Sequence, residues 1–146
     1  VGALAGGLSA AGGGDAVAQL GRPGAAGLAA EFLPGDGRGL DVHVDAVEQG
    51  RVGMVALTLG EHGALLATRE GVWRAQAPKV KLVSTVGAGD SFLAILVCGL
   101  SAGMAVEDAL RQGVAAGTAA LLSPGTDLCR PADIERLLPE ISVKRI

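Results

Sequence analysis

The stretch Ser84-Thr85-Val86-Gly87-Ala88-Gly89-Asp90-Ser91-Phe92 decides how this chain of 146 residues is interpreted. Its two glycines, Gly87 and Gly89, permit a tight turn and a close approach of the backbone to a ligand. An apolar segment near Asp90–Leu100 follows at once, and we expect it to be helical, with Gly103 ending it. A helix N-terminus offers unpaired N–H groups and the positive end of a dipole, so this turn suits an anion.

Asp90 stands at the expected helix N-terminus, where the positive end of the dipole suits a carboxylate. A carboxylate beside an anion cradle fits phosphoryl transfer, because the amides offset charge on the transferred group while the carboxylate takes a proton from the attacking hydroxyl. The tetrapeptide Gly-Ala-Gly-Asp alone is not specific, since an ordinary loop capped by aspartate has the same sequence.

The composition indicates a globular protein with few surface charges, because 49% of the residues are hydrophobic and 18% are charged. The net charge of −3 argues against a nucleic-acid partner, which requires a clustered basic face. No apolar run reaches the roughly 18 residues of a membrane span, so we expect no membrane partner. Cys98 and Cys129 lack metal-ligand spacing, and we interpret them as reduced thiols of a cytoplasmic protein.

Residues 1–40 are rich in glycine and alanine, and glycine costs about 1 kcal/mol against alanine inside a helix. We therefore expect a poorly ordered segment, or one that depends on partners outside the chain. Its best helix candidates are Asp15–Leu20, with Asp15 as N-cap, and Ala25–Phe32, stopped by Pro34. Residues 41–146 would form the second, structured part.

From residue 41 the pattern becomes sharper. Val52–Leu59 is a continuous apolar run, which is typical of a strand buried on both faces, as in parallel sheets. Strand followed by hairpin and packed helices indicates an α/β protein. The other expected elements are a helix Asp41–Gln49 ended by Gly50, a hairpin of Ala64–Thr68 and Gly71–Ala75 turned by Arg69-Glu70, a half-exposed strand Lys79–Val83, a long helix Val106–Leu122, and a last helix Ala132–Leu138 opened by Pro131.

Three segments in the same order resemble the ribokinase-like carbohydrate kinases, and the resemblance covers roughly residues 41–140. STVGAGDSF resembles their C-terminal signature, TLGEHGALL from Thr58 to Leu66 resembles their adenine-nucleotide strand and turn, and the stretch from Gly113 to Pro139 resembles the phosphofructokinase branch, including tagatose-6-phosphate kinases. The resemblance implies an α/β fold, as the C-terminal part of a ribokinase-like three-layer α/β/α fold.

The resemblance also implies a function, an ATP-dependent transfer of phosphate to a sugar-phosphate hydroxyl with Mg²⁺ and a monovalent cation such as K⁺. Asp90 would be the general base, and Gly87, Ala88 and Gly89 would form the anion hole. The implied nucleotide site comprises Thr58, Gly60, Glu61, Gly63, Val114 and Thr118. The implied cation site comprises Ser84, Val86, Ala120, Ser123, Gly125 and Asp127, though for Ser123 and Asp127 a solvated loop cap is an equal alternative.

The sequence departs from the family in two respects. Ile95 follows Ala94 where the family has a small pair, which predicts crowding at a helix contact. The family's N-terminal half, with its lid and sugar-phosphate pocket, is not recognisable, and the start at Val1 suggests a truncated or processed chain. We therefore expect the segment alone to be inactive. For the complete enzyme, we expect a homodimer. The alternatives are a non-catalytic remnant that binds nucleotide or self-associates, and a kinase for fructose 1-phosphate or tagatose 6-phosphate.

Overall fold

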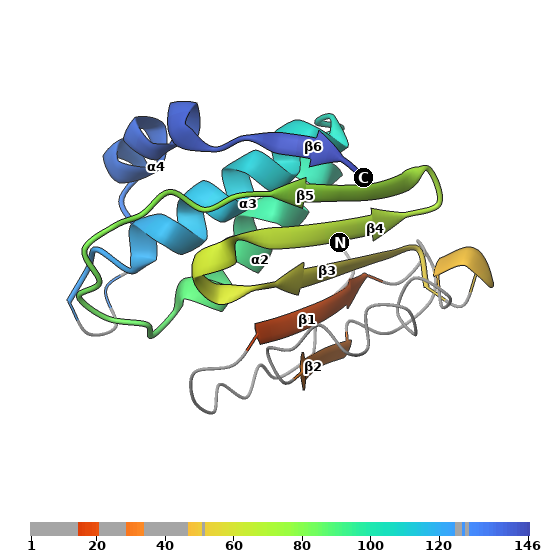
Figure 1. Ribbon diagram of the computed structural model, residues 1–146, viewed down its shortest axis with the longest axis horizontal. Helices are drawn as coiled ribbons and strands as arrows, with labels where there is room; N and C mark the ends of the chain where they lie inside the picture. The colour runs from red at the N-terminus through yellow and green to blue at the C-terminus, as the bar shows by residue number, and fades with distance from the viewer. Residues whose placement is uncertain (1–14, 21–28, 34–46, 51, 125–126, 128) are drawn as a thin grey trace.

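One six-stranded sheet, with the three longer helices on one side, forms the frame of the molecule (Figure 1). The computed structural model describes residues 15–20, 29–33, 47–50, 52–124, 127 and 129–146. The sheet order is β2-β1-β3-β4-β5-β6. The strands are β1 Asp15–Leu20, β2 Ala29–Leu33, β3 Met54–Thr58, β4 Ala64–Thr68, β5 Gly71–Ala75 and β6 Val143–Arg145; the helices are α2 Ala88–Ser101, α3 Val106–Ala120 and α4 Pro131–Leu137, with 3₁₀ turns η1 Gly60–His62 and η2 Leu138–Glu140.

Every strand pairing among the described residues is antiparallel, which corrects the expectation of a parallel sheet. The connections explain the difference, because β3, β4 and β5 follow one another through links too short for the crossover that parallel strands need. The predicted burial of the first apolar run on both faces is nevertheless confirmed. Ala56 belongs to the core under the helices, while Val55 and Leu57 form a second cluster with Val47 on the opposite face.

Two predicted helices near the N-terminus are wrong. Asp15–Leu20 is strand β1, and Ala29–Leu33 is strand β2, while residues 25–28 lie outside the described residues. Segments this short hold a helix only with tertiary support, and here the sheet supplies the partners instead. Val17 pairs with Leu57 of β3 and with Glu31 of β2.

The predicted strand Lys79–Val83 does not form either, and Leu82 and Val83 remain 58% and 55% exposed. The free edge of β5 is occupied by β6, so no strand position is open beside it. The backbone N–H groups of Val83 and Ser84 instead donate to the carbonyl of Leu121 at the end of α3.

The remaining elements confirm the predictions to within a few residues. The hairpin turns at Arg69-Glu70, α2 extends the predicted helix by two residues at its start, and Pro131 begins α4. Residues 47–48 are helical and Gly50 follows with a φ of 71°, while residues 41–46 lie outside the described part. None of the described helices is long and apolar enough to cross a membrane.

Helices α2 and α3 pack backbone to backbone through two glycines of α3. A Cβ atom at Gly117 would lie 3.1 Å from the Ala88 carbonyl oxygen, and one at Gly113 would lie 3.1 Å from the Phe92 carbonyl oxygen. Both separations are tighter than most Cβ contacts in proteins, so a larger residue at either position would force the neighbouring helix to shift. Ile95 is half-buried and outside the described core clusters, so the crowding expected from it is not observed.

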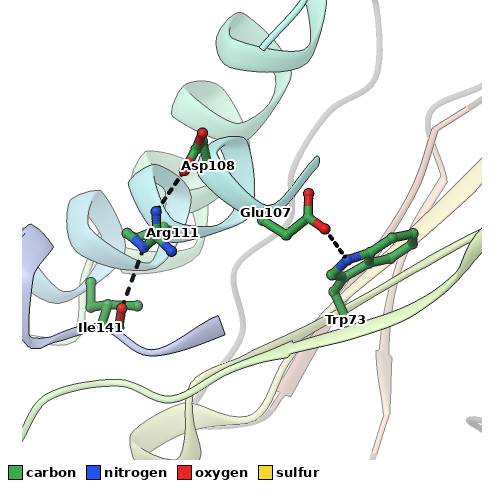
Figure 2. A network of polar contacts seen from close by, with 5 residues as sticks. All are labelled: Trp73, Glu107, Asp108, Arg111 and Ile141. Carbon is green, nitrogen blue, oxygen red and sulfur yellow. Dashed lines mark hydrogen bonds and ion pairs between the residues drawn. The ribbon is translucent and has the colours of Figure 1, made fainter. Parts of the chain in front are cut away.

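A polar network ties the start of α3 to the sheet and to the C-terminal segment (Figure 2). The Trp73 indole donates to Glu107 Oε1 at 2.7 Å, and Arg111 bridges Asp108 at 2.5 Å and the Ile141 carbonyl oxygen at 3.4 Å. The backbone hydrogen bond of Glu107, and next the Trp73 indole, lower the pKa of Glu107 below its ordinary 4.5. The network therefore favours the charged carboxylate at the positive end of the helix.

Replacing Gly117 with valine should destabilise the protein, because the new side chain must displace Ala88 or Phe92. We expect the free energy of unfolding in urea to fall by about 1–3 kcal/mol, the usual cost of overpacking. Gly89→Val is the matched control, since a Cβ atom there meets nothing within 4 Å. Equal losses in the two variants would contradict the close helix contact.

Lowering the pH should weaken the contact between α3 and β5 and so reduce the free energy of unfolding. Because the pKa of folded Glu107 lies below that of the unfolded chain, its stabilisation is present above about pH 4.5 and is lost as the pH falls through the folded value. Urea unfolding, followed by emission of the single tryptophan, should show this loss.

Glu107→Gln should remove that part of the pH dependence. Trp73→Phe should reduce the same pH dependence, because Glu107 loses the hydrogen bond from the indole and keeps the one from the backbone. Unfolding of this variant is followed by circular dichroism. An unchanged slope in Glu107→Gln would exclude Glu107 as its source.

Candidate active site

The stretch Gly87-Ala88-Gly89-Asp90, which we call the signature turn, forms the start of α2, as its glycines predict. Gly87 adopts a left-handed conformation with φ 80° and ψ −1°, and the Ser91 N–H donates to its carbonyl at 2.9 Å. A Cβ atom at Gly87 or Gly89 would meet nothing within 4 Å, so the backbone faces open space. Asp90 lies in the first helical turn and is exposed. The turn thus presents backbone N–H groups and a carboxylate side by side.

The loop before the turn is held by the end of α3. The Leu121 carbonyl accepts hydrogen bonds from Val83 at 2.8 Å and Ser84 at 3.3 Å, and the Ser84 hydroxyl accepts one from the Val86 N–H at 3.2 Å. Gly117, one turn earlier on α3, contacts Ala88 on the other side of the turn. A single helix therefore fixes the signature turn from both sides.

The predicted nucleotide turn connects β3 and β4. Thr58 ends β3, and Gly60 and Glu61 lie in the exposed η1 turn. Gly63 follows with φ 94°, and a Cβ atom there would lie 2.8 Å from the Ala77 nitrogen, so no other residue fits. The Leu59 N–H donates to the Gly63 carbonyl at 2.7 Å, which closes the loop and leaves its tip facing solvent.

Val114 and Thr118, expected near the adenine, are both buried in α3. Val114 belongs to the core between the helices and the sheet. Their described surroundings are therefore those of core residues, and a contact with nucleotide stays a prediction.

The predicted cation residues come from the loop before α2, the end of α3 and the loop that follows α3. Hydrogen bonds connect the first two of these segments. Ser84 and Val86 lie in the loop bonded to Leu121, and that residue directly follows Ala120. Ser123 is buried, and its N–H donates to the Ala120 carbonyl. Asp127 is exposed and its N–H donates to the Pro124 carbonyl, while Gly125 lies outside the described residues. Hydroxyl and carbonyl oxygens of this kind suit a hard cation.

Sequence reasoning missed the residues that position this site. Leu121 acts through its backbone carbonyl, which leaves no trace in the sequence, and no motif marks Glu107 as the hydrogen-bond partner of Trp73. The described residues contain no group of three or more His, Cys, Asp or Glu side chains arranged for a metal ion. A hollow of about 620 Å³ between α3 and η2 is lined by Met104, Arg111 and Ile141 among others, and no residue of the signature turn lines it.

Comparison with known proteins identifies the family. The family description "pfkB family carbohydrate kinase" matches residues 30–133. ATP-dependent 6-phosphofructokinase isozyme 2 of Mycobacterium tuberculosis (strain CDC 1551 / Oshkosh) is 44% identical over 92 residues, which are 63% of this chain and 27% of that protein. The 1-phosphofructokinase of Bacillus subtilis (strain 168) is 42% identical over 100 residues, 68% of this chain and 32% of that protein.

Among solved structures, phosphofructokinase-2 from Escherichia coli in complex with potassium matches with a TM-score of 0.67 and 34% identity, over 72% of this chain and 34% of that chain. The α/β fold expected from the sequence is thereby confirmed. The chain spans only about a quarter to a third of the length of these relatives. Since the family match extends over most of its residues and includes the signature turn, the chain belongs to the pfkB family of carbohydrate kinases.

Proposed function

We propose that this chain is the C-terminal, nucleotide-binding and catalytic part of an ATP-dependent kinase of the 6-phosphofructokinase type. Its substrate would be a sugar phosphate, and the complete enzyme would be a cytoplasmic homodimer. The observation that carries this proposal is the signature turn, in which exposed Asp90 follows open backbone at Gly87 and Gly89. The family membership supports the same reaction class.

In the proposed mechanism, the Asp90 carboxylate takes the proton from the acceptor hydroxyl as the sugar oxygen attacks. The first N–H groups of α2 have no partner within the helix, so those near Ala88 and Gly89 can offset the charge of the transferred phosphoryl group. Side chains are absent from Gly87 and Gly89, which lets that group approach the backbone.

We assign the nucleotide to the turn formed by Thr58, Gly60, Glu61 and Gly63, and we expect Val114 and Thr118 of α3 to lie near its adenine. The exposed tip of this turn supports the assignment. Mg²⁺ would be bound largely by the phosphates of the nucleotide. We assign K⁺ to the oxygens of Ser84, Val86, Ala120, Ser123, Gly125 and Asp127, and the potassium in the Escherichia coli relative supports this choice.

Fructose 1-phosphate is the second candidate substrate. The 1-phosphofructokinase of Bacillus subtilis is 42% identical, close to the 44% of the Mycobacterium 6-phosphofructokinase. The candidate catalytic and nucleotide residues serve either acceptor. Parallel assays of the full-length protein with fructose 6-phosphate, fructose 1-phosphate and tagatose 6-phosphate separate these possibilities.

Asp90→Asn should lower kcat of the full-length protein by roughly two to four orders of magnitude, the scale of a lost general base. The KM for ATP should change little, because Asp90 would meet the acceptor hydroxyl and not the adenine. Steady-state kinetics with ATP and the preferred sugar phosphate measure both quantities.

Asp133→Asn is the matched control, since Asp133 also lies in the first turn of a helix but pairs with Arg136. It should leave kcat unchanged. Near-normal turnover in Asp90→Asn would remove Asp90 from the mechanism.

The 146-residue chain by itself should not phosphorylate sugars. Phosphoryl transfer depends on positioning two substrates and a metal, and this chain spans about a third of its relatives. A coupled assay with ATP, Mg²⁺, K⁺ and fructose 6-phosphate tests this, with Asp90→Asn alongside. Release of ADP that requires both the sugar phosphate and Asp90 would prove the expectation wrong.

A further inference from the structure

The two strands at the C-terminal edge of the sheet place two cations opposite each other. Trp73 of β5 is buried in the core under the helices, so strand alternation directs the next residue, Arg74, to the opposite face. Arg74 pairs in register with Lys144 of β6, and both residues are exposed. Side chains directly opposite in antiparallel strands lie close together, and like charges in such positions destabilise the sheet.

Among the described residues, no carboxylate lies within 4.0 Å of the Arg74 guanidinium or the Lys144 ammonium. The ion pairs found there involve Asp108, Asp133 and Glu61, and none of them reaches Arg74 or Lys144. Arg145, the next residue of β6, is a useful contrast. Its guanidinium lies 5.5 Å from the centre of the Trp73 ring and acts electrostatically on Glu107. Arg145 therefore has a carboxylate near it on the helix face, whereas none of the ion pairs among the described residues includes Arg74 or Lys144.

The two cations border a hollow of about 270 Å³, lined by Arg74, Gln76, Ser142, Lys144 and Ile146, which we call the basic hollow. The Ser142 hydroxyl donates to Gln76 Oε1 at 3.3 Å. This bond orients the Gln76 amide and leaves its NH₂ group as a further donor. The side chains that line the basic hollow therefore combine two positive charges with a neutral donor.

We propose that the basic hollow binds a phosphate group, either as the free ion or as a phosphomonoester. A guanidinium fork matches phosphate oxygens in pairs, and a lysine ammonium adds a point charge. A bound dianion would also relieve the repulsion between Arg74 and Lys144. The site is distinct from the signature turn, because the basic hollow lies on the sheet face away from α2 and α3.

Titration of the ¹⁵N-labelled chain with inorganic phosphate, at ionic strength held constant with chloride, tests the proposal. We expect saturable shifts of the Gln76, Ser142 and Lys144 amides, and the same shifts with fructose 6-phosphate if a phosphomonoester is accepted. Arg74→Gln and Lys144→Gln should each raise the apparent Kd about tenfold or more. Gly89→Val should retain these shifts, which separates the basic hollow from the proposed catalytic turn.

Thermal unfolding of the full-length protein gives a second measurement. Without phosphate, Arg74→Gln and Lys144→Gln should be at least as stable as the parent, because repulsion is relieved. Phosphate should raise the Tm of the parent more than that of either variant. If no saturable shift occurs at these amides, or if both variants respond like the parent, the proposal is overturned and the cations serve only to protect a sheet edge.

Discussion

The close contact between α2 and α3 is the constraint on which the candidate site depends. It exists because Gly113 and Gly117 present no side chain to the carbonyls of Phe92 and Ala88. Ala88 begins α2, so the position of the first helical turn, and of Asp90 within it, follows from how closely the backbones approach. A shift of this contact by the width of one methyl group would displace the carboxylate relative to any substrate held elsewhere.

Helix α3 connects this contact to the sheet at one end and to the loop before the signature turn at the other. Near its start, Glu107 bonds to Trp73 of β5, and beyond its last turn the Leu121 carbonyl holds Val83 and Ser84. The sheet thus orients the helix, and the helix orients the signature turn. Residues with no proposed role in the chemistry therefore contribute to the geometry of the candidate site through their packing and hydrogen bonds.

The sequence predicted those elements whose causes are local. The tight turn at Gly87 and the start of α4 at Pro131 follow from the backbone preferences of those residues, and the hairpin at Arg69-Glu70 follows from two apolar runs close together in the sequence. Strands β1 and β2 were missed because their glycine- and alanine-rich surroundings carry no period, and because the second partner of β1 is the distant strand β3. The candidate catalytic turn was proposed from its glycines and aspartate, whereas the role of the Leu121 carbonyl could not be predicted, since every residue has a carbonyl group.

The solvent exposure of Asp90 and its neighbours bears on the proposed phosphoryl transfer. Asp90 is exposed, and the nearby loop residues Leu82 and Val86 are 58% and 54% exposed. A base open to solvent exchanges protons with water, and electrostatic stabilisation by backbone amides is weak until water is excluded. In the proposed kinase, protein outside the described residues must therefore cover this turn. The exposed apolar loop beside Asp90 offers a surface for such a cover, so one contact would both bury Leu82 and Val86 and exclude water from the proposed base.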